Sequence, residues 1–371
     1  MIANENKKNT DLKGIRVLDL SRLLPGPACT WYLQSMGAQV DRIEPQNGDL
    51  TRYIPPFMDG VGAYYCAVGS GKRSMACESR HPSFSNMIKK MLPYYDVLVE
   101  GFRPGVLETM GLSMDVLHQH NPQLIIARLS GYGQDGPYRD VVGHDINYIA
   151  LAGILSAQAQ TEKGISLPAV QIADMSGALH AALGIVGALF SREKHGGGRV
   201  LDISLTESAM AIFAPMITGI LAEKRNAHAG KEPLSGGLSY YNTFRCSDGL
   251  WIAVGAVEQK FQQNIRKVVG SLQYDELKQF FSKHSRDEVL LLLGDACASP
   301  VLDILELPQH EQHQYRQIFE GNLLQNPLGY MNSTIPKLGI HGKDILRECG
   351  FLDNEIELLI DEGCVWDKKT L

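Results

Sequence analysis

Strand-like and helix-like segments alternate along the first third of the chain, and this alternation limits the possible fold more than any other feature. The apolar runs that we expect to form buried strands are residues 15–20, 39–44, 96–100 and 124–130. Residues 27–36 have helical spacing and begin at Pro27, whose missing N–H would have no partner at a helix start in any case. Strands that alternate with helices favour a parallel sheet.

Helical periodicity dominates residues 145–222, where a short strand-like run, residues 200–204, follows three consecutive glycines. Two apolar stretches in this region, near 178–190 and 209–222, are shorter than the roughly 20 residues that span a bilayer, and the second contains Pro215. We therefore expect both stretches to be core helices and predict no membrane span.

The later part of the chain predicts a second, smaller domain. Two strand-like runs flank Asp248-Gly249, a pair that favours the tight turn of a β-hairpin, and the helix-like residues 352–362 are expected to pack back on the first domain. The predicted parts are a large α/β domain at 1–222 completed by 330–371, a linker at 223–237, and a small α+β domain at 238–329. The predicted fold class is α/β, with a Rossmann-like large domain and a parallel sheet.

Composition excludes several classes of protein. The chain has 371 residues, of which 44% are hydrophobic, and this is enough for a sizeable core. A net charge of −6 without basic blocks gives no electrostatic basis for binding nucleic acid. Seven scattered cysteines without Cys-x-x-Cys spacing predict neither disulfides nor a zinc site. Residues 1–13 are polar and lack the apolar core of a secretory signal, so we expect a cytoplasmic protein with reduced thiols.

His144 is the first candidate for chemistry. It precedes residues 145–150, which have helical spacing, so its ring is expected at a helix N-terminus. The helix dipole there favours a neutral imidazole that can accept a proton. A single histidine is more often structural than catalytic, and this one is one of eleven.

Asp174 is the second candidate and follows His144 by thirty residues, just before the apolar stretch that begins near residue 178. An aspartate in this position is equally typical of an N-cap, whose side chain accepts backbone N–H bonds. A carboxylate at a helix start can also serve as a base or a nucleophile. Together, the imidazole and the carboxylate suit chemistry that removes a proton from carbon and returns one.

Four cations lie at strand ends or in glycine-rich loops, where ligands collect in open α/β sheets. They are Arg42, Lys72, Arg73 and Arg103. Each is a candidate for holding phosphate, and taken separately each is also typical of a solvated surface cation. Residues 69–74 lack P-loop spacing and the first strand-to-helix turn lacks Gly-x-Gly-x-x-Gly, so a dinucleotide redox cofactor is not expected.

Other polar residues give weaker signals. The histidine pairs His118/His120 and His310/His313 have no acidic or cysteine partners at ligand spacing, so we predict no metal site. Glu258 ends the expected hairpin of the smaller domain and, by spacing alone, is an exposed glutamate.

Several motifs occur in an order that resembles the family III CoA-transferases, the CaiB/BaiF group. They are residues 16–22, 26–27, 71–74, 100–106, 130–138 and 198–205. The resemblance runs from about Leu12 to Val365. Within the family, Gly143-His-Asp-Ile-Asn-Tyr148 and Ala173-Asp174 are similar to the α-methylacyl-CoA racemase branch, whereas transferase members keep the aspartate but generally carry another residue at position 144.

The resemblance implies roles for the candidate residues. His144 and Asp174 would be paired bases, and Glu258 would support the histidine. The residues implied in binding CoA are Arg42, Lys72, Arg73 and Arg103 for the phosphates and adenine, and Gly131 and Tyr132 near the thioester. CoA would enter as part of an acyl-CoA substrate, with no separate redox or metal cofactor, and the protein would form an interlocked homodimer with active sites at the interface.

The chain departs from the racemase pattern in two places. Racemases usually carry an asparagine shortly before the catalytic aspartate, where Val170-Gln171 stands here. Ala178 replaces part of a glycine run after the aspartate, and we expect it to narrow the space beside the acyl chain.

The function predicted from these residues is inversion of the α-carbon of a 2-methylacyl-CoA thioester, by proton transfer between two bases through an enolate. Free histidine titrates near about 6.5 and free aspartate near about 3.9, so reversible turnover requires a smaller difference between the two pKa values. Burial of Asp174 would raise its pKa and so reduce this difference. The alternative is CoA transfer between a thioester and a free acid through an anhydride on Asp174. A third hypothesis is a CoA-binding regulator without turnover.

Overall fold

The computed structural model describes residues 9–329 and 334–367, and they form two compact units. The first unit contains residues up to 152, residues 170–213 and residues from 318 onward, and the second contains residues 153–169 and 214–317. Parts of the predicted tail at 1–13 and of the segment 330–371 lie outside the described residues.

The division between the units differs from the predicted linker at 223–237, because it falls inside helix α9 (Leu205–Ala222). Only the first turns of α9 are buried, at Leu205, Thr206, Ser208 and Ala209, so the rest of the helix leaves the core of the first unit. Residues 318–329, which we expected in the small domain, cluster with the first unit.

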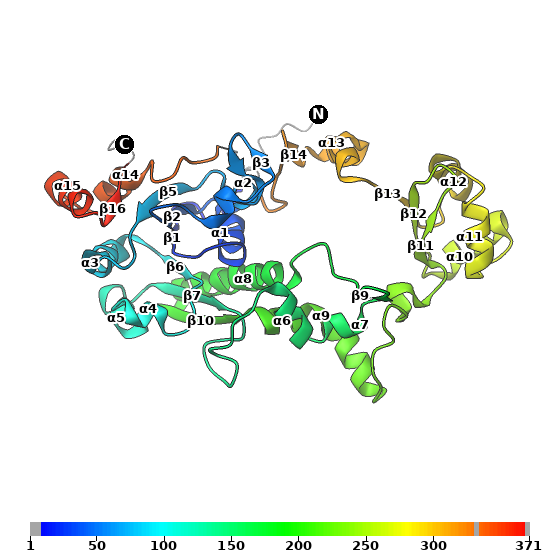
Figure 1. Ribbon diagram of the computed structural model, residues 1–371, viewed down its shortest axis with the longest axis horizontal. Helices are drawn as coiled ribbons and strands as arrows, with labels where there is room; N and C mark the ends of the chain where they lie inside the picture. The colour runs from blue at the N-terminus through cyan, green and yellow to red at the C-terminus, as the bar shows by residue number, and fades with distance from the viewer. Residues whose placement is uncertain (1–8, 330–333, 368–371) are drawn as a thin grey trace. The chain divides into compact units, whose positions relative to one another are not determined.

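A seven-stranded sheet forms the centre of the first unit (Figure 1). Its strands, in spatial order, are β10 (Arg199–Ser204), β7 (Ile125–Ser130), β6 (Val97–Glu100), β1 (Arg16–Asp19), β2 (Gln39–Pro45), β5 (Arg73–Cys77) and β16 (Val365–Trp366). All neighbours are parallel except β16, which pairs antiparallel with β5. The expected strands are confirmed. Strand β5 was missed, because its sequence was interpreted as part of a glycine-rich loop.

Both faces of the sheet are covered, which explains why its strands are continuous apolar runs. Alternate residues of one strand enter different cores: Val97 and Val99 of β6 face one core, and Leu98 between them faces the other. The helices of the first core are α1 (Pro25–Ser35) and α8 (Ile172–His195). Those of the second core are α3 (Pro82–Met91), α5 (Met114–His120), α14 (Gly342–Glu348) and α15 (Asp353–Asp361).

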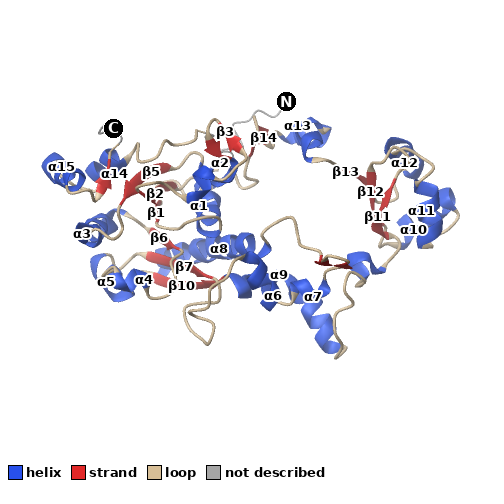
Figure 2. Cartoon of the chain, in the orientation of Figure 1, coloured by secondary structure: helices blue, strands red, loops and turns tan. Residues whose placement is uncertain are grey.

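Shorter elements complete the first unit (Figure 2). They are the 3-10 turns η2 (Leu50–Tyr53) and η3 (Leu92–Tyr94), the helices α2 (Ala63–Gly69), α4 (Val106–Thr109) and α6 (Asp145–Leu151), and the short strands β3 (Phe57–Met58), β4 (Val61–Gly62), β14 (Phe319–Glu320) and β15 (Leu323–Leu324).

The second unit is a small α+β structure. Its antiparallel sheet contains β11 (Tyr241–Arg245), β12 (Trp251–Gly255) and β13 (Ala298–Val301), and the expected hairpin through Asp248-Gly249 is present. Gly249 has φ +83°, a conformation that favours glycine. The helices α10 (Gln259–Val269), α11 (Tyr274–Phe281) and α12 (Arg286–Leu293) share one core with this sheet.

The remaining elements from residue 153 to residue 317 are short. They are α7 (Ile154–Ala157), β8 (Gln160–Thr161), β9 (Gly164–Ile165), η4 (Pro233–Gly237), η5 (Ile304–Gln309) and α13 (Glu311–Arg316).

Helices α8 and α9 contain the two apolar stretches and are longer than those stretches suggested, at 24 and 18 residues. By length and composition alone both could cross a membrane. In α8, 50% of the most apolar 18-residue stretch is buried inside the chain, as in a core helix. In α9, 22% of the corresponding stretch is buried.

Leu98 lies in β6 with no exposed surface, so Leu98→Ala leaves a cavity beneath the helices of the second core. We expect this substitution to lower the free energy of unfolding by about 2–5 kcal/mol in urea denaturation. The matched control is Leu358→Ala on α15, where the side chain is exposed and the expected change is within about 0.5 kcal/mol. Equal losses in the two variants would contradict the proposed core.

Candidate active site

Asp174 is the third residue of α8 and is bound to the rest of the site through its backbone. Oδ1 of Asp145 accepts hydrogen bonds from the N–H groups of Ala173, at 2.6 Å, and of Asp174, at 3.2 Å. The N-cap position of α8 is Gln171, whose side chain makes no capping bond. The N-cap hypothesis for Asp174 is therefore wrong, and the cap is supplied by Asp145 from another helix.

His144 immediately precedes α6, as the sequence predicted, and its side chain is exposed. The N–H of His144 donates to Oδ1 of Asn147 at 3.0 Å, which fixes the entry of the chain into the helix. His144 and Asp145 are consecutive, and Asp145 accepts hydrogen bonds from the backbone of α8. These hydrogen bonds place the two candidate bases in the same part of the first unit.

Burial and, as the smaller cause, the negative charge of Asp145 together raise the pKa of Asp174 to about 7. Both protonation states of the carboxyl group are therefore accessible near neutral pH. A group in this state can accept a proton in one direction of a reaction and donate it in the other.

An aromatic cluster borders the two candidate bases. The Tyr148 ring packs edge-on against Tyr132, with centroids 5.1 Å apart, and the centroid of the Tyr138 ring lies 5.3 Å from that of Tyr132. The Tyr148 hydroxyl donates to the carbonyl of Gly143 at 2.5 Å and so holds the residue before His144. Burial, and next the charge of Asp174, raise the pKa of Tyr148 to about 12.

Gly131 approaches this cluster so closely that a Cβ atom there would overlap the Tyr148 ring. Its carbonyl accepts hydrogen bonds from the N–H of Thr206, at 3.0 Å, and from the Thr206 hydroxyl, at 2.8 Å. The predicted thioester residues Gly131 and Tyr132 thus lie beside the segment that carries His144.

Arg103 is the predicted cation nearest this cluster, since its positive charge opposes the rise in the pKa of Tyr148. It is exposed in the loop after β6, and no carboxylate within residues 9–329 or 334–367 pairs with it. The loop is anchored by Glu100, which accepts from the Phe102 N–H at 2.7 Å and pairs with Arg128 at 2.8 Å.

Arg42 and Lys72 are buried, so the hypothesis of solvated surface cations is wrong for both. Arg42 pairs with Asp49 at 2.6 Å, while its Nε and Nη1 have no hydrogen-bond partner among the described residues. The Lys72 ammonium donates to the Pro27 carbonyl at 2.7 Å and lies 3.7 Å from Asp19. Desolvation lowers the pKa of Lys72 to about 7.

Arg73 pairs with Asp41 and with Glu348, each at 2.6 Å. Arg42, Lys72 and Arg73 thus each contact acceptor groups of this chain. Their contact with CoA stays a prediction.

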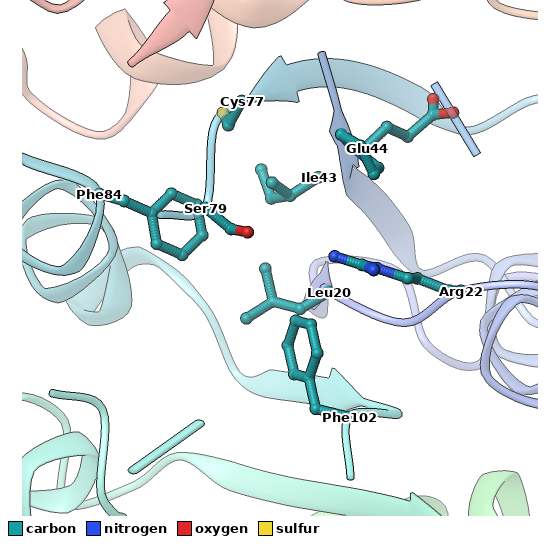
Figure 3. A pocket seen from close by; sticks show the side chains of 9 residues that line it. Leu20, Arg22, Ile43, Glu44, Cys77, Ser79, Phe84 and Phe102 are labelled. Atoms are coloured by element: carbon teal, nitrogen blue, oxygen red, sulfur yellow. The ribbon is translucent and has the colours of Figure 1, made fainter. Parts of the chain in front are cut away.

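A small pocket lies where β1, β2 and β5 end, beside the loop after β6 (Figure 3). Its lining is Leu20, Arg22, Ile43, Glu44, Pro45, Cys77, Ser79, Phe84 and Phe102. The Arg22 guanidinium lies 5.4 Å from the centroid of the Phe102 ring. We did not single out Arg22 from the sequence, although it follows the first strand directly, and that position was the available signal.

The remaining predicted residues are Glu258, which belongs to the second unit, and Ala178, which belongs to the first. Glu258 is exposed in the second unit, just before α10, and its support of His144 stays a prediction. Ala178 is fully buried in the core shared with α1, and its narrowing of the space beside an acyl chain stays a prediction. The described residues contain no group of three or more histidine, cysteine or acidic side chains placed to hold a metal ion.

The fold and site together define an α/β protein with a histidine and a protonatable aspartate near the carboxyl ends of a parallel sheet. The model of CoA-transferase family III matches residues 12–326, and the chain belongs to this family.

Two kinds of relative are similar to this chain. Human α-methylacyl-CoA racemase is 33% identical over 392 residues, covering 97% of this chain and 98% of that protein. Succinyl-CoA–D-citramalate CoA-transferase of Chloroflexus aurantiacus is 30% identical over 299 residues, covering 79% of this chain and 73% of that protein. Among solved structures, a CaiB/BaiF family protein from Brucella suis superposes with a TM-score of 0.82 at 25% identity, covering 92% of this chain and all of that one.

Asp174→Asn tests the environment of the buried carboxyl group. The pKa of Asp174 is higher in the folded protein than in the unfolded chain, so the folded state holds this proton more tightly. The contribution of Asp174 to the free energy of unfolding is therefore fully present below about pH 4 and is lost as the pH rises to about 7. We expect the variant to gain stability over the parent between pH 5 and pH 8, by on the order of 2–4 kcal/mol at pH 8 in thermal unfolding.

The matched control is Asp140→Asn, where the aspartate is largely exposed and no such pH-dependent gain is expected. If the stability difference between Asp174→Asn and the parent were constant from pH 5 to pH 8, Asp174 would not be the group described.

Proposed function

We propose that the protein is a racemase or epimerase that inverts the α-carbon of 2-methylacyl-CoA-type thioesters. The arrangement that carries the proposal is Asp174 at the start of α8, held by Asp145 beside the segment that carries His144. Burial and the charge of Asp145 raise the pKa of this carboxyl group toward neutrality. The similarity to mammalian α-methylacyl-CoA racemases over almost the whole chain supports the same reaction class.

Inversion requires a proton to leave one face of the α-carbon and another to arrive on the opposite face. In one direction, the neutral His144 imidazole removes the α-proton, the C–H electrons form an enolate, and protonated Asp174 delivers its proton to the other face. In the reverse direction the carboxylate removes the proton and the imidazolium returns one. Each positioned acid or base contributes roughly 10²–10⁴-fold.

The enolate oxygen needs hydrogen-bond donors. The first N–H groups of a helix have no acceptor inside it, and those at the start of α6 lie next to His144. These donors would stabilise the negative oxygen in the transition state.

CoA would bind along the carboxyl ends of the strands. Arg22 and Arg103 are exposed cations on the loops after β1 and β6, and the pocket beside them has apolar walls that include Ile43 and Phe102. The two unpartnered nitrogens of Arg42 are consistent with a phosphate oxygen as an acceptor. Lys72 and Arg73 would contribute if ligand binding changed their present partners.

CoA transfer between a thioester and a free acid is the second candidate. In that reaction the Asp174 carboxylate attacks the thioester carbonyl, the C–S bond breaks, and CoA leaves as the thiolate, with the acyl group held as a mixed anhydride. The 30% identity to a CoA-transferase favours this alternative, in which His144 has no essential role.

We also propose an interlocked homodimer. Large apolar side chains are exposed along α8 and α9, where a second copy would cover them. They are Leu179, Leu183, Phe190, Met210, Ile212 and Leu221. A cytoplasmic location is a further proposal, supported by seven cysteines that are all unpaired.

The racemase proposal is tested by exchange of the α-hydrogen in D₂O. With a 2-methylacyl-CoA substrate and no second acid, the parent is expected to place deuterium at the α-carbon. His144→Ala and Asp174→Asn should each lower the exchange rate by at least about 100-fold, because each removes one acid–base group. Asp140→Asn, the matched surface control, should exchange at the parental rate.

Mass spectrometry follows the deuterium, and hydroxylamine separates the alternative. Three results together would establish transfer and refute the racemase. Asp174→Asn would lose all activity, His144→Ala would keep the parental activity, and hydroxylamine would trap an adduct on Asp174 that forms only with an acyl-CoA. Binding of acyl-CoA without exchange or transfer would favour the regulator.

The dimer is tested by Leu183→Glu, which places a charge on the exposed apolar face of α8, where the parent side chain is 71% exposed. Sedimentation velocity is expected to show a dimer for the parent and a monomer for the variant. A monomeric parent at micromolar concentration would refute the proposal. Leu358→Glu on the exposed face of α15 is the control and should leave the parent's oligomeric state unchanged.

A further inference from the structure

The covalent connection between the two candidate bases does not by itself hold them in place. His144 stands before α6 and Asp174 lies in α8, and residues 153–169 between these helices belong to the second unit. The chain therefore leaves the first unit between the two helices. Their starts must be fixed by contacts made within the unit.

Asp145 makes such a contact. The first N–H groups of α8 have no acceptors within the helix, and Gln171 at its N-cap supplies none through its side chain. One oxygen of Asp145 accepts from both Ala173 and Asp174. A carboxylate at a helix N-terminus interacts favourably with the helix dipole, and its hydrogen bonds are stronger than those of a neutral acceptor.

We propose that Asp145 is the positioning residue that joins the two bases, because its carboxylate ties the start of α6, with His144, to the backbone of Asp174. Its negative charge lies beside the carboxyl group of Asp174 and, after burial, is the second influence that favours the protonated form. This inference rests on the proposed racemase function and assigns a role that is distinct from those of the two bases.

The charges around α8 support the second part of the inference. The elements packed most extensively against α8 are α1, α6, β7 and β10. Leu205 at the start of α9 also lies against Gly177 of α8, and the titratable residue in that first turn of α9 is Glu207. The titratable side chains of α1, α6, β7 and β10 are Cys29, Tyr32, Asp145, Tyr148, Arg128, Arg199 and Asp202. Among these, Asp145 is the charged group that acts with burial to raise the pKa of Asp174. Arg128 is engaged with Glu100 and Glu108.

Two substitutions separate charge from position. Asp145→Asn keeps an oxygen that can accept the two N–H groups but removes the negative charge. Asp145→Glu keeps the charge but moves the oxygens by one methylene group. The matched control is Ser113→Ala, which removes the side-chain cap of α5 in the same unit and touches neither base.

Two measurements are made on the parent and the three variants. The titration of Asp174 is followed by NMR of ¹³C-labelled aspartate, assigned with Asp174→Asn, and does not depend on turnover. The α-hydrogen exchange rate is measured against pH, with kcat and KM determined separately.

In Asp145→Asn we expect the pKa of Asp174 to fall by at least about one pH unit. For the reaction direction in which Asp174 accepts the proton, the acid limb of the exchange profile should move to lower pH by the same amount. In Asp145→Glu we expect the titration to stay near the parent's and kcat to fall about 10-fold or more with KM little changed, because misplaced groups react slowly. Ser113→Ala should lower only the thermal stability.

An unchanged Asp174 titration in Asp145→Asn, together with parental kcat in Asp145→Glu, would overturn the proposal. If the titration moves as expected but the parent shows no α-hydrogen exchange, the effect of Asp145 on Asp174 stands and the racemase function fails. Should Asp145→Asn not fold, Asp145→Ser, a neutral variant that keeps an oxygen acceptor, takes its place.

Discussion

The parallel pairing of β1 with β2 on one side and β6 on the other decides where this protein can bind a ligand. The chain runs outward from β1 through β2 to β5 and then returns to the opposite side of β1 at β6, so the loops after β1 and β6 diverge. Crevices in open α/β sheets form at such a point. Arg22 follows β1, and Phe102 and Arg103 follow β6, which places them together at this end of the sheet.

Buried ion pairs support the loops at this end of the sheet. Lys72 faces Asp19, and Arg42 pairs with Asp49. Removing one partner from a buried pair leaves an uncompensated charge and is strongly destabilising, whereas the intact pair contributes little net stability. Such pairs favour one arrangement of the strand ends over others. Arg22 and Arg103, on the loops after β1 and β6, are exposed and stay available to an anionic ligand.

Local patterns in the sequence predicted the strands and the hairpin well, because apolar runs and an Asp-Gly turn depend on neighbouring residues. Partners distant in the chain were not predictable in this way. Lys72 is buried against Asp19, which is 53 positions away, and nothing in its glycine-rich surroundings indicates burial. The acceptor role of Asp145 was missed for the same reason, since its donors lie 28 and 29 residues further on. The positions of His144 and Asp174 before helix-like segments made them candidates, and the family resemblance implied their paired roles, whereas their environment required the fold.

The chain passes between its two units four times, after residues 152, 169, 213 and 317. Neither unit is therefore a continuous module. A gene fragment covering residues 214–317 would lack residues 153–169, which also belong to the second unit. Removing both segments would leave the first unit, with its sheet, divided among three separate stretches of chain. Recombination with a single breakpoint cannot exchange the second unit intact, so the two units are expected to have diverged together rather than to have been shuffled as independent parts.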